Sequence, residues 1–321
     1  MPPTSYTGLR PTSPILTDLA VGSASNLAGR YKALELGPLH VVPEIKGKIK
    51  KRPINDSFRR STTEFPINGP MKGSNINFTE LDFLLFLAGW AMRHDVRLPQ
   101  NDLPGSLPVH EQNACLEKIY MDMEFRHRDL LTTLGNYLTT HRVTLTSGSG
   151  TQFNQVTSNP TKVFNDALEA ITLTTSGPIR QVSARQRVWD YLAAHPQVID
   201  RARGYTGSTA SSFMAQTIAE AYGFTKAVVL DAAYDSSIPG ATASLARIWG
   251  NDMIFQCLDE ASSEDSLSHT KTLSLYGGVV ESGQWQPTPH QDETYVQAAY
   301  QLTILNQYAG YLVKDAITSG L

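Results

Sequence analysis

The chain has 321 residues, of which 41% are hydrophobic, and it carries 27 Lys and Arg against 30 Asp and Glu. This is the balance of a globular protein of one large or two average domains, and a formal charge of −3 gives no general attraction to nucleic acid or to an anionic membrane. Cys115 and Cys257 lack the spacing of a disulfide framework, a zinc site or a redox pair, which favours a reducing compartment. The longest apolar stretch, 81–92, is too short to cross a bilayer, and Asp18 interrupts the only candidate signal core. We therefore expect a soluble protein that is not exported.

Residues 1–40 are rich in Pro, Ser, Thr and Gly, and their apolar side chains are too scattered to form a core. These apolar residues include Leu16, Leu19, Val21 and Leu27. We expect an N-terminal arm that is either disordered or lies on another surface, to which its few Leu and Val side chains would dock.

Residues 40–78 form short runs with a period of two, interrupted by Gly and Pro. Side chains two residues apart share one face of a strand, so Lys46, Lys48 and Lys50 would lie on one side and Ile49 on the other. The same segment adds four more basic residues, Lys51, Arg52, Arg59 and Arg60. The pattern predicts a long, basic, two-stranded hairpin that projects from the body and is stabilised by packing on a neighbour.

Residues 79–96 are apolar, and we expect them to form a helix or a strand followed by a helix. After a linker at 99–108, apolar residues recur every three to four positions from 109 to 141. This spacing predicts one long amphipathic helix that acts as a spine, roughly 45 Å long at 1.5 Å per residue.

The Ser-Gly repeat at 147–150 indicates a boundary, after which helix and strand patterns alternate. We expect helices at 160–172, 183–195 and 211–222, and strands at 226–231, 248–259 and 270–276. Residues 293–317 are expected to return as a strand to the part of the fold that contains the spine helix. The sequence thus predicts a mixed α+β fold in which an α/β unit is inserted into a discontinuous first unit.

A search for chemistry finds no catalytic or metal-binding pattern. None of the eight histidines has ligand spacing, and we interpret them as surface or cap residues. The stretch Gly207-Ser208-Thr209 lacks the second glycine of a nucleophile elbow. Asp231 has no phosphate-binding loop beside it, so we interpret it as a strand end. We expect no catalytic residue, no cofactor and no metal.

The basic hairpin leaves two functional interpretations open, besides that of a solvated charged loop. Its lysines and arginines would displace counterions from the phosphates of a nucleic acid, or they would meet an acidic surface on another copy of the chain. Phe58 and Phe65 are the only aromatic residues within it, which argues against a stacking platform for single strands.

The order of these parts resembles a tailed-phage major capsid protein of the Hong-Kong-97-type fold. The residues that carry the resemblance are LHVVP at 39–43 with the lysine-rich strand after it, AAHPQVI at 193–199, AVVLDAAYD at 227–235 and IWGND at 248–252. The resemblance extends over about residues 30–317, and it depends on the ordered set of motifs rather than on any one of them.

The resemblance implies five parts. They are an N-terminal arm (1–40), an E-loop hairpin with flanking strands (41–78), a P-domain with the spine helix (79–150), an A-domain (151–284) and a C-terminal return to the P-domain (285–321). It implies a homo-oligomer of pentamers and hexamers that forms an icosahedral shell around double-stranded DNA. The E-loop residues Lys46, Lys48, Lys50, Lys51, Arg52, Arg59 and Arg60 would then contact neighbouring subunits.

The resemblance further implies assembly in the host cytoplasm, a place in the virion capsid, and portal, scaffolding and decoration proteins as partners. Packaged DNA would be contacted non-specifically, and no membrane would be involved. Some relatives crosslink an E-loop lysine to an asparagine of a neighbour, but no pattern in this sequence identifies such a partner. An encapsulin-like nanocompartment shell, an α/β enzyme and a DNA-binding protein are the alternatives.

Overall fold

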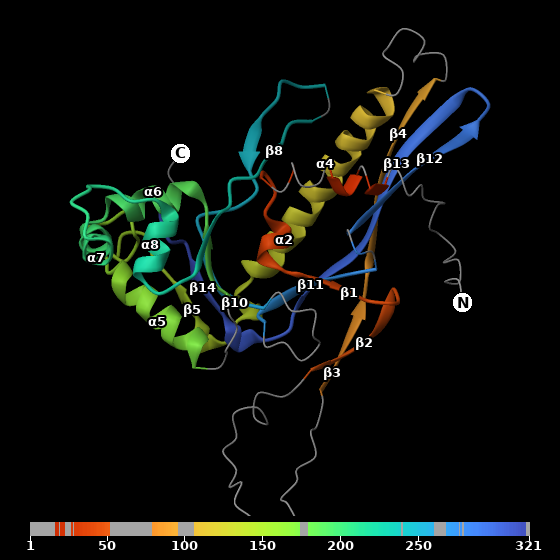
Figure 1. Ribbon diagram of the computed structural model, residues 1–321. Coiled ribbons are helices and arrows are strands. Elements are labelled where there is room, and N and C mark those ends of the chain that lie inside the picture. The colour runs from red at the N-terminus through yellow and green to blue at the C-terminus, as the bar shows by residue number, and fades with distance from the viewer. Residues whose placement is uncertain are drawn as a thin grey trace, which may run out of the picture.

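The computed structural model describes residues 17–18, 20–22, 27, 29–51, 79–95, 106–173, 179–238, 240–259, 268–275, 277 and 279–318. It is a mixed α+β fold, as predicted, in which two lobes lie side by side (Figure 1). The long helix α4 (Ser106–Leu131) crosses the first lobe, and a group of shorter helices covers the second.

The first lobe is a five-stranded sheet with α4 packed on one face. The strand β13 (Gln291–Ile304) is its centre, because it pairs antiparallel with three other strands. The remaining strands are β1 (Leu39–Val41), β4 (Phe86–Asp95), β11 (Thr270–Ser274) and β12 (Val280–Thr288). Of these, β1 pairs in parallel with β11.

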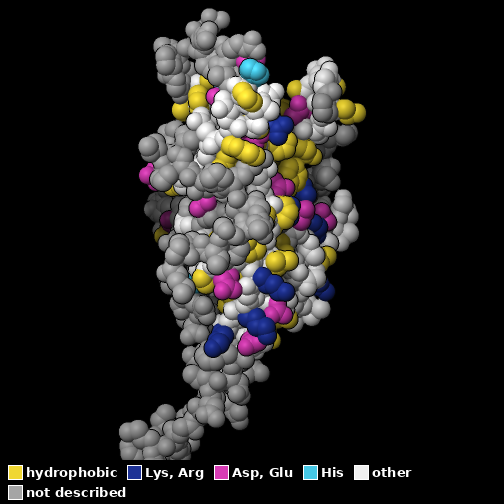
Figure 2. Space-filling model, turned by 90° about the vertical axis from the view of Figure 1, so that its right-hand side faces the viewer, with side chains coloured by type: hydrophobic (Ala, Val, Ile, Leu, Met, Phe, Trp, Pro, Cys, Tyr) yellow, Lys and Arg dark blue, Asp and Glu magenta, His cyan; other side chains and the backbone are white. Residues whose placement is uncertain are grey.

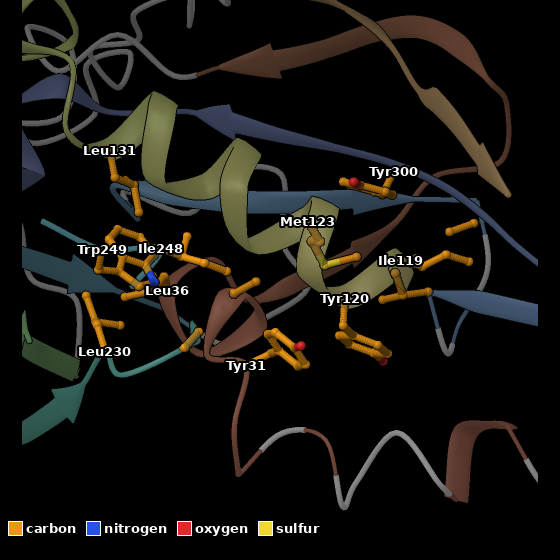
Figure 3. Close-up of a cluster of buried hydrophobic side chains, with 14 of the residues drawn as sticks. Tyr31, Leu36, Ile119, Tyr120, Met123, Leu131, Leu230, Ile248, Trp249 and Tyr300 are labelled. Carbon is orange, nitrogen blue, oxygen red and sulfur yellow. The ribbon is translucent and has the colours of Figure 1, made fainter. Parts of the chain in front are cut away.

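The core of this lobe lies between α4 and β13. Ile119 and Met123 are buried on the helix, and Val296 and Tyr300 are buried on the strand. Spacings of three and four residues repeat along the helix and spacings of two along the strand, so each element presents one apolar face to the other. Figure 3 shows Ile119, Met123 and Tyr300 toward one end of this cluster and Leu36 and Trp249, which come from outside the sheet, toward the other.

The predicted spine helix is confirmed, but its end is wrong by about ten residues. It ends at Leu131, and two short 3-10 turns follow, at Leu134–Asn136 and Thr139–His141. The hydroxyl of Thr132 donates to the carbonyl of Arg128, and the Asn136 amide donates to the carbonyl of Leu130. Polar side chains therefore satisfy the last carbonyls of the helix and replace the next helical turn.

The prediction of a helix within residues 79–96 is wrong, because this stretch is two strands. The strand β3 (Thr79–Leu84) pairs with β2 (Lys46–Lys51), and β4 pairs with β13 over ten residues. A continuous apolar run fits a strand and a helix equally well. Pairing with β13, about 200 positions along the chain, decides between them.

The second lobe is a sheet of order β5-β14-β10-β6-β7 covered by four helices. Its strands are β5 (Arg142–Thr144), β6 (Ile179–Ala184), β7 (Lys226–Val229), β10 (Met253–Leu258) and β14 (Gly310–Lys314). Its helices are α5 (Pro160–Thr172), α6 (Gln186–Ala194), α7 (Pro196–Thr206) and α8 (Ala215–Ala221). A small hairpin of β8 (Ala233–Asp235) and β9 (Leu245–Arg247) projects from it.

The helix α5 matches its predicted range because its start is encoded locally. Asn159 accepts a hydrogen bond from the backbone N–H of Lys162 at 2.9 Å, and Pro160 occupies the first turn. Phe164 of this helix stacks on Tyr222 with ring centroids 4.5 Å apart, which ties α5 to the segment after α8.

The chain crosses between the lobes more often than the sequence predicted. The strand β11 and the first part of β12 belong to the first lobe although they fall within the range 151–284 expected for the inserted unit. The predicted return after residue 285 applies to β13, but β14 pairs with β10 and β5 in the second lobe. The predicted boundary at 284/285 therefore falls inside the strand β12.

Candidate functional site

The basic strand β2 forms an antiparallel ribbon with β3. Lys46, Lys48 and Lys50 lie on its exposed face, and Ile49 on the opposite face is 3% exposed, as the period of two predicted. Lys51 is the last residue of β2. The other three predicted contact residues, Arg52, Arg59 and Arg60, lie outside the described residues, as does most of the predicted hairpin.

Two acidic residues on β3 share the face of the lysines. Asp82 is opposite Lys48 and Glu80 is opposite Lys50, and Lys48 forms an ion pair with Glu80 at 2.6 Å (Nζ to Oε2). This hydrogen bond and its charge raise the pKa of Lys48 and lower the pKa of Glu80. The described ribbon still carries four lysines against two acids, Glu80 and Asp82, and Figure 2 shows basic and acidic side chains intermixed low on this face of the molecule.

Sequence reasoning missed these acids because it interpreted residues 79–96 as partly helical. The alternation of Glu80 and Asp82 with Leu81 and Phe83 could have revealed a strand. The ion pair of Lys48 weakens the nucleic-acid interpretation for the described part, because a lysine paired within the chain releases fewer counterions from a phosphate backbone.

The base of the ribbon is anchored to the first lobe. Ile49 and Phe83 pack with Leu273 of β11 and Ala299 of β13 in a small core of their own. The backbone N–H of Leu84 also donates to the side chain of Gln301 at 3.0 Å. These contacts fix the direction in which the ribbon leaves the lobe, away from the sheet (Figure 1).

The strand β4, which continues directly from the ribbon, forms an apolar edge. Among the described residues it pairs with β13 on one side and with no strand on the other. Leu87 and Trp90 on this strand are about half exposed, and Leu84 just before it is 63% exposed. Single subunits normally protect such an edge, so a ten-residue edge with exposed apolar side chains is a candidate contact surface.

The described residues hold no group of three or more side chains suited to a metal ion, and none of their helices has the length and hydropathy of a membrane span. The interpretation of the histidines as surface or cap residues is wrong for most of them. His195 does lie between α6 and α7 as a cap, but it is buried. The buried histidines are His40, His94, His127, His141, His195 and His269.

His127 illustrates how a buried histidine ring is accommodated in this fold. His127 on α4 is fully buried, its Nδ1 lies 2.8 Å from the carbonyl oxygen of Met123, and its pKa is lowered to about 4 because desolvation disfavours the charged ring. The ring of His127 is thus part of the packed interior.

Asp231, expected to be a strand end, follows β7 and forms an exposed ion pair with Arg247 at 3.4 Å.

Comparison with known proteins gives no match to a family model and none to a curated protein sequence. Solved structures do match. A phage-related protein from Bordetella bronchiseptica has a TM-score of 0.76 at 18% identity, over 96% of this chain and 98% of that one. The capsid of cyanophage P-SCSP1u has a TM-score of 0.54 at 11% identity, over 87% and 86%. A virus-like particle from Pyrococcus furiosus has a TM-score of 0.53 at 13% identity, over 94% and 98%.

These matches extend through both lobes, so the likeness is to whole chains and not to one shared motif. The chain has the fold of tailed-phage capsid proteins, as the ordered motifs of the sequence predicted.

Proposed function

We propose that this chain is the major structural subunit of an icosahedral phage head, in which pentamers and hexamers of it enclose double-stranded DNA. The observation that carries the proposal is the capsid fold over almost the entire chain. A fold alone does not fix a function, so the surfaces of the subunit have to support the proposal independently.

Two adjoining surfaces provide that support. The β2–β3 ribbon reaches away from the body with few apolar residues of its own to bury, and the β4 edge beside it exposes Leu87 and Trp90. Repeated contacts between identical subunits would cover both surfaces. In this proposal the hairpin (41–78) and the arm (1–40) lie across neighbours, except for residues 33–40, which are held by the chain's own lobes. The second lobe meets its copies at the five-fold and six-fold axes.

The seven basic residues Lys46, Lys48, Lys50, Lys51, Arg52, Arg59 and Arg60 are proposed as contacts between subunits. The role is non-enzymatic and needs no cofactor. Portal, scaffolding and decoration proteins, and DNA held without sequence preference, are the proposed partners in a virion assembled in the host cytoplasm.

A nanocompartment shell is the second candidate, because the virus-like particle from Pyrococcus furiosus has the same fold. Electron microscopy of the expressed chain tests both shells against an enzyme or a small DNA-binding protein. Closed particles are expected, and a monodisperse monomer would contradict both. The neighbouring genes then separate the two, since a phage head requires portal and terminase genes and a nanocompartment requires a cargo gene.

Replacing Leu87 by Lys tests the β4 edge. Because Leu87 is about half exposed, the subunit should fold with an unchanged melting temperature, while a charge on the edge blocks strand pairing with a neighbour. Sedimentation velocity should then show subunits or small oligomers in place of particles. Leu173→Lys is the matched control, because Leu173 is 70% exposed at the end of α5 in the other lobe. Equal particle yields from the two variants would exclude the edge as a contact.

Reversing the charges on the exposed face of the ribbon tests its role. Lys48→Glu alone places two acidic residues opposite each other, because Lys48 is opposite Asp82, and this disfavours the ribbon itself. Adding Lys50→Glu, Glu80→Lys and Asp82→Lys restores opposite charges at both cross-strand pairs but leaves the charge pattern reversed toward a neighbour. We expect the fourfold variant to fold normally and to need a roughly tenfold higher concentration to assemble. Assembly at the native concentration would show that these pairs act only within their own chain.

A further inference from the structure

The strand β7 is the last strand of the second sheet. Among the described residues it pairs in parallel with β6 and with no strand on its other side. An edge strand presents N–H and C=O groups that a strand of another chain can pair with. The free edge of β7 is therefore a place at which two copies of this chain can join.

The sequence around β7 favours such pairing. Residues 224–230 read FTKAVVL, with one charge and several β-branched or aromatic side chains. Val228 and Leu230 are buried on one face with Leu36 of α2 (Ala33–Leu36), as Figure 3 shows for Leu230 and Leu36. Ala227 and Val229 pack against the core of the second lobe on the other face. Since both faces are covered, the edge is the part of this strand that another chain can reach.

The side chain of Gln216 on α8 (Figure 1) occupies this edge. Its Oε1 accepts a hydrogen bond from the backbone N–H of Ala227 at 2.8 Å, and its Nε2 donates to the carbonyl of Thr225 at 3.0 Å. A parallel neighbouring strand would bond to the same two groups, because each of its paired residues bonds to two residues that are two positions apart. One side-chain amide thus takes the place of one residue of an added strand.

Further contacts hold the amide and the edge in position. Nε2 of Gln216 also donates to Oε1 of Glu220, four residues along α8, at 2.7 Å. Only one orientation of the amide satisfies all three bonds, since Ala227 donates whereas Thr225 and Glu220 accept. Thr225 is fixed on β6, because its N–H and its hydroxyl donate to the carbonyl of Arg180 at 2.8 and 3.0 Å.

The free edge of the first sheet is closed in a similar way. The strand β12 lies at that edge, and the hydroxyl of Thr17 from the arm bonds to both backbone groups of Ser282. It accepts from the N–H at 3.2 Å and donates to the carbonyl at 3.3 Å. In each sheet a side chain from another part of the chain therefore occupies an edge strand.

We propose that Gln216 closes the β7 edge against strand pairing with the β7 edge of a second copy. The same short strand from two copies can pair antiparallel about a two-fold axis, because each copy then offers the same groups to the other. The closure stands on contacts within one chain. Its use, to keep second lobes from joining through strands where they meet in a shell, rests on the proposed function.

The first measurement is hydrogen–deuterium exchange of the Ala227 amide in dilute protein. Gln216 is exposed, so Gln216→Ala should fold normally while it removes the acceptor of this amide. We expect exchange at Ala227 to become roughly fivefold faster, as for the loss of one hydrogen bond. Equal exchange rates in the native chain and in Gln216→Ala would overturn the closure, because the amide would then not be bonded to Gln216 in solution.

The second measurement is sedimentation velocity over a series of concentrations. Gln216→Ala should form species larger than those of the native chain, and their share should grow with concentration. Gln186→Ala is the matched control, because Gln186 is exposed on α6 and donates to Asp190 four residues along at 2.7 Å, but α6 follows β6, which lies inside the sheet. It should sediment like the native chain. Since each variant is compared with the native chain, the result does not depend on whether shells form.

A second substitution locates the association. Ala227→Pro, added to Gln216→Ala, removes the N–H at the free edge, and it costs no bond to β6 because this N–H bonds to Gln216. The double variant should regain the sedimentation of the native chain with an unchanged circular dichroism spectrum. If Gln216→Ala sediments like the native chain at every concentration, the amide only ties α8 to β7. If a folded double variant still associates, the contact lies on another surface. Either result would overturn the closure.

Discussion

Replacing Gly310 by Ala should destabilise the subunit by about 3 kcal/mol, which is the upper end for overpacking a core. Gly310 begins β14, opposite Gln256 of β10. A Cβ at this position would lie 2.2 Å from Nε2 of His269. The ring cannot move aside, because His269 is fully buried, packs on Tyr137 with centroids 5.3 Å apart and has its Nδ1 3.0 Å from the Gln256 amide nitrogen. Urea unfolding at one protein concentration measures the effect.

Two further variants show whether the ring is the cause. Gly204 lies inside α7 with no atom within 4 Å of a Cβ, so Gly204→Ala should be neutral or stabilising by about 0.5–1 kcal/mol. His269→Ala removes the ring, so adding Gly310→Ala to it should cost much less than Gly310→Ala costs in the native chain. Additive effects of the two substitutions would place the strain elsewhere.

The sequence predicts best those elements whose signals are local. The helix α5 has its cap and its proline within the first turn, and the ribbon strand β2 has its period of two. The exposed lysine face was predictable for the same reason. None of these features depends on what the rest of the chain does.

Features that depend on distant pairing were missed. The strand β4 pairs with β13, and Phe86 is opposite Tyr300. No residue between 79 and 96 indicates that β13 is the pairing strand. The acidic face of the ribbon and the apolar edge of β4 were lost together with this strand. For the candidate site, the sequence therefore predicted the lysines of β2, but it did not predict the acidic residues of β3 that partly neutralise them or the apolar edge of β4 beside them.

Buried polar groups were missed for another reason. Glu124 and His127 are three residues apart on the face of α4 that also carries Tyr120 and Leu131. Polar residues on an apolar helix face indicate a buried network, and this signal was present in the sequence. Which groups they contact depends on Trp249 and Thr272, and only the fold brings those residues to the helix.

Acid should destabilise the fold through two buried histidine rings, those of His127 and His269. Desolvation lowers the pKa of His127 to about 4 and that of His269 to about 3, whereas an unfolded chain binds a proton at each ring near pH 6.5. The folded state thus binds fewer protons than the unfolded state, and stability falls as the pH drops from 6.5 to 4. Each ring should cost on the order of 3 kcal/mol over that range.

Glu124 acts in the opposite direction, because its raised pKa makes the folded state bind the extra proton between pH 7 and 4.5. The net slope for the native chain therefore mixes the two effects, and a variant is needed to isolate one ring. His127→Gln keeps a polar group of similar size on α4 but removes the titration. Between pH 6.5 and 4.5, the unfolding free energy of the native chain should fall more steeply than that of the variant, by about 1.4 kcal/mol per pH unit.

The slope is the informative quantity, since His127→Gln will also lower stability at neutral pH by disturbing the contacts with Met123 and Thr272. His290→Gln is the matched control, because His290 is exposed in the turn between β12 and β13 and should leave the slope unchanged. If His127→Gln and the native chain lose stability in parallel on acidification, the ring of His127 is protonated in the fold. The prediction that the buried ring of His127 makes the fold sensitive to acid would then be wrong.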